Sequence, residues 1–361
     1  MKFSDVLDIR NGRNQRQVEN ENGKYPIYGS GGIMGRATDF ICDAGTVVIG
    51  RKGSINNPIF VDEPFWNVDT AFGLVAHRDV LLPKYLFYFC VNFDFERLNT
   101  TVTIPSLTKA NLLQIEINVP DMDEQRRVVS ILDKICQLID LQQQELHSLD
   151  QLVKSRFIEL FGDPLIEDDR YPRVPLGSLA QVGSSKRIFE KEYVSEGIPF
   201  YRTKEIVELS KGNRITTELF ITKERYDEIR SEYGVPQKGD LLISAVGTIG
   251  VIWIVDGKND FYFKDGNLLR VSATEKFVPE YLKHLLEALI SAYKSEMSSG
   301  TAYAALTISA LKEMMVYDVP HAEQEQFAAF VEQTDKSKLA VQKGLQELEI
   351  LKKSLMQQYF G

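Results

Sequence analysis

The sequence predicts a mixed α/β (α+β) protein with two tandem globular units of strands and helices. Two long helices join them and form an antiparallel coiled coil with pseudo-two-fold symmetry. Three observations predict this fold. The chain repeats itself at a distance of about 200 residues. Short β-rich runs with glycine-containing turns precede each copy of the repeat. Each copy carries apolar residues at helical spacing over about 40 residues.

The repeat is clearest in residues 119–162 and 319–361, which both begin with Val-Pro and end with Phe-Gly. A shift of 199 positions places Glu124-Gln125 on Glu323-Gln324 and Leu152 on Leu351. The repeat continues into the preceding residues, because GTVVIGRKGSIN resembles the later GDLLISAVGTIG. Self-similarity over this length indicates an internal duplication of one globular unit followed by one helix. The sequence therefore predicts globular units at 1–120 and 164–320, a central helix at 121–163 and a C-terminal helix at 321–361.

Each long segment is predicted to be helical because its apolar residues recur every three, four or seven positions. Asp121 and Asp123 can cap the first helix, and Gly162 followed by Pro164 can end it. A helix of about 40 residues is about 60 Å long and needs a partner along its apolar stripe. The simplest partner is the other copy, and the alternative is that each helix packs only on its own globular unit. The polar middle of the second helix, residues 334–338, is expected to pack less well.

Within the globular units, β-rich runs predict strands and proline-opened runs predict helices. The predicted strands are 46–50, 57–62 and 72–77 in the first unit, and 240–247, 251–256 and 267–273 in the second. The predicted helices are 83–92 and 279–296.

Composition narrows the function classes. The chain has no apolar run long enough for a membrane span, and the N-terminus MKFSDVLDIR does not resemble a signal peptide. The three cysteines are far apart, so we expect reduced core thiols in a cytoplasmic protein. A formal net charge of −9 argues against a basic coat for nucleic acid, so any DNA contact must come from local loops.

Three short motifs are weak signals for catalysis or nucleotide binding. NPIF (57–60) approaches the Asn-Pro-Pro-aromatic loop of amino-methyltransferases, but Ile59 replaces the second proline. GSGGIMG (29–35) has glycines but no following amphipathic helix, which favours a glycine-rich hairpin over a dinucleotide site. GRKGS (50–54) lacks the end of a phosphate-binding loop. The sequence thus predicts no catalytic centre, no cofactor site and no metal site in this chain.

Basic loops are the more informative feature. RNGRNQR (10–16) contains three arginines and no acidic residue, and Arg51-Lys52 lie in another acid-free run. SSKR (184–187) and YRTK (201–204) occupy comparable positions in the second unit. Arginine and lysine among glycine, serine and asparagine can donate to phosphates and to base edges, so these loops are candidates for DNA contact. The alternative is that they are ordinary solvated surface loops.

The whole chain resembles the DNA specificity subunits of type I restriction–modification systems. The resemblance rests on YPIYGSGGIMG, on GTVVIGRKGSIN with GDLLISAVGTIG, and on TIPSLTKANLLQIEINVPDMDEQ. The last is echoed by YAALTISALKEMMVYDVPHAEQEQ, and each leads into a long helix ending in Phe-Gly. The resemblance implies two target recognition domains, at 1–120 and 164–320, each reading one half of a split DNA site. It also implies that the two helices are a spacer between the half-sites.

The family resemblance further implies a subunit without chemistry of its own. It would bind double-stranded DNA, two adenine-methylating modification subunits and ATP-dependent restriction subunits, which would hold S-adenosylmethionine, ATP and magnesium. Matching motifs nominate Thr103, Ser106, Lys109, Thr301 and Tyr303 for DNA contact, and the loops around the glycine hairpin and its counterparts nominate others. The latter are Arg36, Arg51, Lys52, Lys186, Arg187, Arg202, Lys204 and Thr248. Two other hypotheses stay open: a diverged stand-alone DNA methyltransferase, and a coiled-coil assembly scaffold that binds no DNA.

Overall fold

The computed structural model describes residues 1–98, 106–166, 170–297 and 305–361. The chain divides into two compact units. Unit 1 comprises Met1–Glu145 and Val341–Gly361, and unit 2 comprises Leu146–Ala340. Both long helices therefore contribute to both units, and the functional boundaries expected at residues 120, 163 and 320 stay a prediction. No helix in the described ranges is long and apolar enough to cross a membrane.

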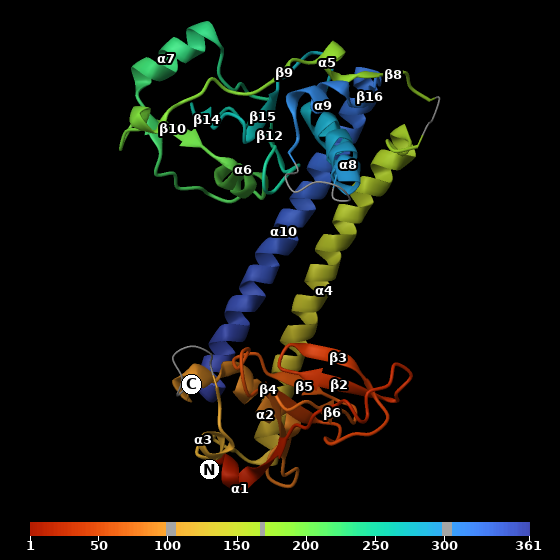
Figure 1. The fold of residues 1–361 in the computed structure, drawn as a ribbon, viewed down its shortest axis with the longest axis vertical. Helices are drawn as coiled ribbons and strands as arrows, with labels where there is room; N and C mark the ends of the chain where they lie inside the picture. The colour runs from red at the N-terminus through yellow and green to blue at the C-terminus, as the bar shows by residue number, and fades with distance from the viewer. Residues whose placement is uncertain (99–105, 167–169, 298–304) are drawn as a thin grey trace. The chain divides into compact units, whose positions relative to one another are not determined.

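Unit 1 is built on a four-stranded antiparallel sheet in the order β1-β7-β4-β5. A second sheet, in the order β3-β2-β6, contains the hairpin predicted from the glycine-rich stretch, with Gly29 opposite Gly32. These elements are coloured red to orange in Figure 1. The strands are β1 (Leu7–Asn11), β2 (Tyr25–Gly29), β3 (Gly32–Ala37), β4 (Thr46–Gly50), β5 (Ile59–Val61), β6 (Trp66–Asn67) and β7 (Ala71–Ala76). The helices are α1 (Phe3–Val6), α2 (Pro83–Asn92), η1 (Phe95–Leu98), α3 (Lys109–Leu113) and the start of α4 (Met122–Phe161).

Unit 2 repeats this architecture. Its main sheet has the order β13-β12-β15-β9, so each strand has a counterpart in unit 1, and β10 pairs with β14 in parallel as β2 pairs with β6. The strands are β8 (Arg173–Pro175), β9 (Val182–Gly183), β10 (Ile198–Tyr201), β11 (Phe220–Ile221), β12 (Leu241–Ser244), β13 (Ile252–Ile254), β14 (Tyr262–Phe263), β15 (Leu268–Val271) and β16 (Met315–Tyr317). The helices are α5 (Leu176–Leu179), η2 (Glu190–Glu192), α6 (Thr203–Ser210), α7 (Lys223–Glu232), α8 (Pro279–Met297), α9 (Ile308–Glu313) and α10 (His321–Phe360).

The predicted strands and helices form, although several strands are shorter than the apolar runs that predicted them. The run 57–62 yields only β5 (Ile59–Val61), because Pro58 has no N–H for a sheet ladder. The run 240–247 ends as β12 at Ser244, because the chain turns at Gly247 with a φ of +74°. Both proline-opened helices, α2 and α8, begin at their proline as predicted.

Helices α4 and α10 pack against each other within each unit, so the predicted pairing is confirmed and the alternative of two separate helices is wrong. In unit 1, Met356 of α10 belongs to the same buried cluster as Val128 and Leu132 of α4. In unit 2, the rings of Phe157 and Phe327 lie 5.3 Å apart. Higher numbers in α4 meet lower numbers in α10, which makes the helices antiparallel.

The polar middle of α10 packs better than its composition suggests. The side chain of Thr334 is buried, and its hydroxyl donates to the Phe330 carbonyl at 2.9 Å, which satisfies it within the helix. Lys338 forms an ion pair of 2.8 Å with Asp150 of α4. The expectation of loose packing at residues 334–338 is therefore wrong at these two positions, because polar groups there find partners in unit 2.

The cysteines are core residues, as predicted. Cys42 and Cys90 are buried, and Cys136 is half-buried in the apolar cluster of unit 1. Burial raises the pKa of the Cys42 thiol to about 12 and also raises the pKa of Cys90, because the thiolate would lose its hydration. These two thiols are therefore protonated at neutral pH and unsuited to nucleophilic chemistry.

Candidate nucleic-acid interface

Two loops and one strand of unit 1 meet at the segment that precedes β7. The Arg13 N–H donates to the Asn67 carbonyl at 2.8 Å, and the Val68 N–H donates to the Tyr28 carbonyl at 3.0 Å. The Arg51 N–H donates to the Thr70 carbonyl, also at 2.8 Å. The basic loop after β1, the strand before the hairpin turn and the loop after β4 are thus fixed to one segment by backbone hydrogen bonds. Loops far apart in the sequence consequently share one edge of the unit.

The loop after β4 is also joined to the segment before α3. Lys52 and Ser106 form an antiparallel bridge, and the Leu107 N–H donates to the Arg51 carbonyl at 3.0 Å. Thr108 caps α3 by accepting from the Asn111 N–H, which places Lys109 in its first turn. The structure therefore brings together Arg51, Lys52 and Ser106, which sequence reasoning nominated from two different motifs.

Several cations at this edge form no ion pair with the described residues. No carboxylate in the described part of the chain lies within ion-pair distance of Arg13, Arg16, Arg51 or Lys52, and all four side chains are exposed. The Arg51 guanidinium lies over the Phe72 ring, 5.8 Å from its centre, which orients it without using its hydrogen-bond donors. Exposed cations with free donors are what phosphates and guanine edges require.

Other nominated cations in unit 1 hold the fold. Arg36 donates to the carbonyl oxygens of Gly23 and Lys24 at 2.6 and 2.8 Å, which fastens the strand β3 to the preceding loop. Lys109 donates from Nζ to the Ile9 carbonyl at 2.8 Å. Both side chains thus use hydrogen-bond donors within the protein. Each has fewer donors left for DNA than Arg51 has.

The start of β3, just after the turn of the glycine hairpin, presents two apolar side chains that sequence reasoning did not nominate. Ile33 and Met34 are 65% and 62% exposed, and no atom would meet a Cβ at Gly31 or Gly32 within 4 Å. Two neighbouring, exposed, large apolar residues beside an open turn suit contact with a groove or a base. The signal was present in the sequence, because GGIMG places two large apolar residues directly after the glycines of the turn.

Unit 2 has a matching set of converging loops. The Ala245 N–H donates to the Asn267 carbonyl at 2.8 Å, and the Leu306 N–H donates to the Ala245 carbonyl at 2.9 Å. The Ser184 hydroxyl joins the same edge by donating to the Leu268 carbonyl at 2.8 Å. The nominated Thr248 is exposed in the loop after β12, and its carbonyl accepts from the Ser244 hydroxyl.

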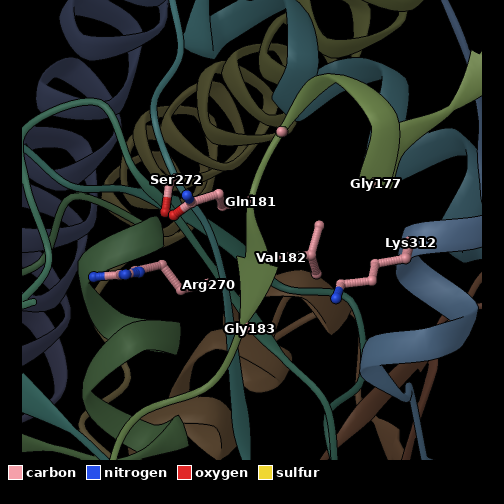
Figure 2. A pocket seen from close by; sticks show the side chains of 8 residues that line it. Gly177, Gln181, Val182, Gly183, Arg270, Ser272 and Lys312 are labelled. Carbon is pink, nitrogen blue, oxygen red and sulfur yellow. The ribbon is translucent and has the colours of Figure 1, made fainter. Parts of the chain in front are cut away.

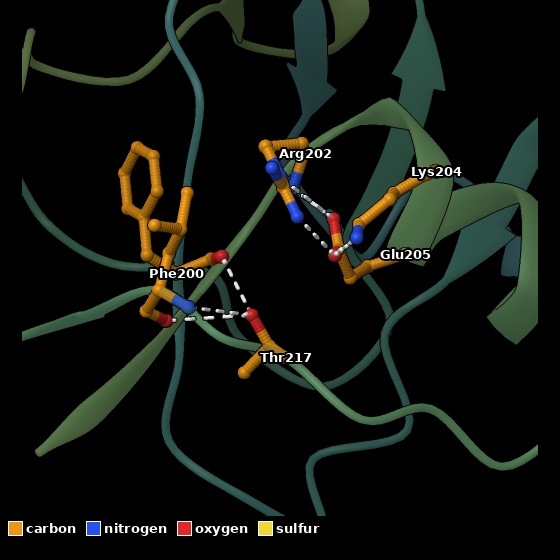
Figure 3. A network of polar contacts seen from close by, with 6 residues as sticks. Phe200, Arg202, Lys204, Glu205 and Thr217 are labelled. Carbon is orange, nitrogen blue, oxygen red and sulfur yellow. Dashed lines mark hydrogen bonds and ion pairs between the residues drawn. The ribbon is translucent and has the colours of Figure 1, made fainter. Parts of the chain in front are cut away.

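The nominated cations of unit 2 form more ion pairs and aromatic contacts within the protein than those of unit 1. Arg187 forms a 2.7 Å ion pair with Asp265, and the Lys186 ammonium lies over the Tyr233 ring, 4.6 Å from its centre. Arg202 and Lys204 both face Glu205, at 3.0 and 3.5 Å, as Figure 3 shows. Glu205 is only 2% exposed and also accepts from the Arg202 backbone N–H at 2.8 Å.

Arg202→Ala is therefore expected to destabilise unit 2. The change leaves the buried Glu205 carboxylate with Lys204 as its remaining cation, and loss of a hydrogen bond to a charged group costs about 1.5–3 kcal/mol. Urea unfolding followed by Trp253 fluorescence checks it. Lys211→Ala removes an exposed i,i+3 pair with Glu208 and should change stability by under about 0.5 kcal/mol. Equal effects of the two variants would show that the Arg202 pair is not structural.

Three nominated residues, Thr103, Thr301 and Tyr303, lie outside the described residues. They belong to the segments that lead into Ser106 and Ala305, whose bridges to Lys52 and Val246 are described. Their nomination stays a prediction.

One cavity of unit 2, beside β9, does not assemble a reaction site. A shallow cavity of about 330 Å³ lies beside β9 and is lined partly by Arg270 and Lys312. These cations lie on opposite sides of β9, and the Arg270 guanidinium points away from Lys312 (Figure 2). Arg270 also faces Asp240 at 3.9 Å. No group of three metal-ligating side chains occurs in the ranges that the structure describes.

Comparison with known families identifies the duplicated architecture. The family model of the type I restriction modification DNA specificity domain matches residues 1–151 and again 170–350. The chain belongs to this family. Each match includes one set of converging loops, so the duplicated loops lie within two DNA specificity domains.

Relatives of this specificity family agree with the assignment. A Haemophilus influenzae protein named for type I restriction enzyme specificity subunits is 27% identical over 334 residues, which are 90% of this chain and 83% of that protein. A Mycoplasma pneumoniae protein named for the N-terminus of a type I specificity subunit is 26% identical over 139 residues, which are 37% of this chain and 74% of that protein.

Solved structures show the same fold. The type I restriction–modification S subunit from M. genitalium has a TM-score of 0.62 at 18% identity, and the match covers 100% of this chain and 95% of that one. A chain from a structural study of type I R-M complex assembly and conformational transition has a TM-score of 0.61 at 17% identity, with 100% and 96% covered. The predicted fold class, two specificity units with paired long helices, is thereby confirmed.

Proposed function

We propose that this chain is the DNA-sequence-specificity subunit of a type I restriction–modification complex and binds a bipartite DNA site. Each unit reads one half-site with its converging loops, and α4 and α10 set the distance between the halves. The observation that carries the proposal is the duplicated loop scaffold, which in unit 1 presents exposed cations with no ion pair to the described residues, within a DNA specificity domain. Two-fold use of one scaffold suits two separated half-sites better than one continuous site.

The chemistry is proposed to belong to partner subunits. In this proposal two modification subunits bind S-adenosylmethionine and methylate adenine, and restriction subunits use ATP and magnesium. This chain then contributes no catalytic residue and supplies only recognition and assembly. Support comes from its family.

Methylome sequencing tests the proposed function directly. A host with the intact gene and its partner genes should carry one adenine-methylated motif made of two short sequences separated by unspecified bases. Deletion of the gene should remove that motif, and restoring the gene should restore it. A motif that persists after deletion, or a dependent motif without a gap, would overturn the proposal.

Arg51→Ala combined with Lys52→Ala should weaken DNA binding by the assembled complex. Loss of the phosphate contact proposed for Arg51 should reduce the slope of log affinity against log salt by about 1, because fewer counterions are released. Fluorescence anisotropy with a labelled duplex measures the affinity and its salt dependence between about 50 and 200 mM salt. Over this range the affinity of a protein that binds many phosphates falls about 10³- to 10⁵-fold. Arg126→Ala with Arg127→Ala removes equal charge from cations paired with Asp123 and Glu124, and should leave the slope unchanged.

The methyltransferase hypothesis keeps one candidate motif, NPIF. In the structure Asn57 is exposed and Ile59 begins β5, where it pairs with Val48. A stand-alone methyltransferase would bind S-adenosylmethionine without partners, so calorimetry with the purified chain discriminates the two functions. Heat of binding with the chain alone would favour the enzyme, and none should be seen if this chain acts only in recognition.

A further inference from the structure

The loops after β4 and β12 share one backbone structure but carry side chains of different chemical character. Aligning the two strands places Arg51, Lys52 and Gly53 on Ala245, Val246 and Gly247. Both loops belong to the repeated sequence, yet their side chains differ at the first two of these positions. The structure shows that the difference falls on an equivalent framework.

Matched hydrogen bonds establish that framework. The residue at the first position donates to the segment before β7 or β15, with 2.8 Å from Arg51 to Thr70 and 2.8 Å from Ala245 to Asn267. Its carbonyl accepts from the leucine before α3 or α9, at 3.0 Å in unit 1 and 2.9 Å in unit 2. All these bonds join backbone atoms, so side chains can change without altering the loop.

The turn that follows is also the same. Gly53 and Gly247 both have a positive φ, of 79° and 74°. The next buried isoleucine donates to each glycine carbonyl, with 2.9 Å from Ile55 and 3.1 Å from Ile249. Lys52 bridges Ser106, and Val246 bridges Ala305. The second loop position is therefore held in the same backbone environment in both units.

The side chains at this second position are both exposed and opposite in character. Lys52 is exposed and has no carboxylate within ion-pair distance in the described part of the chain. Val246 is 41% exposed, although a valine gains from burial. The first position differs in another way, because Ala245 is buried whereas Arg51 lies over Phe72. Of these first two positions, only the second thus offers an exposed side chain in both loops.

We infer that position 52 in unit 1 and position 246 in unit 2 are equivalent specificity-determining positions, and this rests on the proposed function. Lys52 reads guanine, because its ammonium can donate to the O6 and N7 acceptors in the major groove. Val246 reads thymine, because its methyl groups can contact the C5-methyl group and lose water in doing so. One scaffold thus serves two half-sites by exchanging one exposed side chain, and the backbone bonds keep the geometry constant.

Reciprocal single substitutions test the inference in the complete system. Lys52→Val and Val246→Lys are each introduced into the intact gene, and the host methylome is sequenced. Lys52→Val should change the base preference by about 10- to 100-fold at one position of one half-site, with loss of a guanine requirement. Val246→Lys should change one position of the other half-site, with loss of a thymine requirement. Exchange at the first position is avoided, because arginine does not fit the buried site of Ala245.

Exposure-matched controls separate base reading from general effects. Val91→Lys, at a residue of α2 that is 42% exposed, and Lys24→Val, at an exposed lysine before β2, should leave both half-sites unchanged. If a variant abolishes methylation, competition binding with duplexes mutated at each base of the half-site decides the case. Equal weakening for all sequences would make Lys52 a phosphate contact and overturn the assignment.

The outcomes also distinguish this inference from the proposed function. Absence of any gene-dependent bipartite motif in the parent host would contradict the proposed function itself. A bipartite motif that both variants leave unchanged, or that either variant changes in both halves, would contradict only the assignment of positions 52 and 246. A change confined to one half by each variant, in different halves, supports it.

Discussion

Phe161→Ala is expected to lower the free energy of unfolding of unit 2 by about 3–5 kcal/mol, the usual cost of removing a buried phenylalanine. Phe161 is fully buried at the end of α4, next to the glycine that ends the helix. Its ring lies 4.9 Å from Tyr281 of α8 and 5.7 Å from Phe327 of α10, in edge-on geometries. One side chain therefore joins both long helices to the helix that covers the sheet, and alanine would leave a cavity among all three.

The repeat supplies a matched comparison, because Phe360 is the counterpart of Phe161. Phe360 is only half-buried, at the end of α10, with its ring 5.0 Å from Tyr85 and 6.3 Å from Phe89. Phe360→Ala should therefore destabilise unit 1 by less than Phe161→Ala destabilises unit 2. Ile158→Ala, at a residue of α4 that is 46% exposed, should have a small effect.

The two tryptophans allow each unit to be followed separately. Trp66 lies in unit 1 and Trp253 in unit 2, and the chain has no others. Urea unfolding is measured by fluorescence in Trp66→Phe and Trp253→Phe backgrounds, since one signal from two units need not be two-state. Equal losses for Phe161→Ala and Ile158→Ala would show that the aromatic cluster does not hold the helices.

Much of the fold could be predicted from the sequence because periodicity and repetition are local signals. The spacing of Leu146, Leu149 and Leu152, repeated after 199 residues, predicted two long helices and their pairing. The glycine-rich stretch predicted the β2–β3 hairpin for the same reason, since a turn signal needs only neighbouring residues.

The candidate interface was less predictable because it depends on bonds between distant segments. The motif around Arg51 gave no sign that its carbonyl would accept from Leu107. Likewise, YRTK was read as a free basic loop, whereas Glu205 is buried against both Arg202 and Lys204. Composition shows how many charges a loop carries, but the number that remain unpaired is decided by tertiary contacts.

Two glutamines of the repeat, Gln125 and Gln324, are buried, and the sequence did not predict their burial. Both were matched as part of a Glu-Gln pair at the start of a helix, where polar residues are usually solvated. Instead each is fully buried. Because a buried amide must find partners, their burial points to a structural role that the repeat alone did not specify.

Gln324→Leu is expected to destabilise unit 2 by at least about 1–3 kcal/mol, the cost of one buried backbone group left unsatisfied, because three backbone groups lose this partner, and to loosen the attachment of α10. The Gln324 side chain accepts from the Val278 N–H at 2.8 Å, directly before the proline that opens α8. Its amide donates to the carbonyl oxygens of Val319 and Lys276 at 2.9 and 3.1 Å. One side chain thus ties the first turn of α10 to the start of α8 and to the chain that enters the helix.

Gln125 makes the same three kinds of bond in unit 1. It accepts from the Leu82 N–H at 2.8 Å and donates to Val80 and Pro120 at 2.8 and 2.9 Å. If α4 and α10 set the distance between half-sites, as proposed, both attachments must be rigid for that distance to be reproducible. Gln125→Leu and Gln324→Leu should therefore relax the unspecified gap in the methylated motif, so that sites one base pair shorter or longer become methylated.

Gap length is a readout that a loss of stability alone would not move, because a partly unfolded subunit methylates less but still methylates the same motif. The methylome of each variant is compared with that of Gln326→Leu, at an exposed glutamine two residues away on α10. Growth at reduced temperature keeps the variants folded, and urea unfolding confirms it. If Gln125→Leu and Gln324→Leu both keep the gap length of the parent protein, despite the expected loss of stability, the glutamines only stabilise the units. A relaxed gap in both variants would show that the hydrogen bonds of Gln125 and Gln324 keep the spacer length constant, because each variant removes the same kind of bond at the start of one long helix.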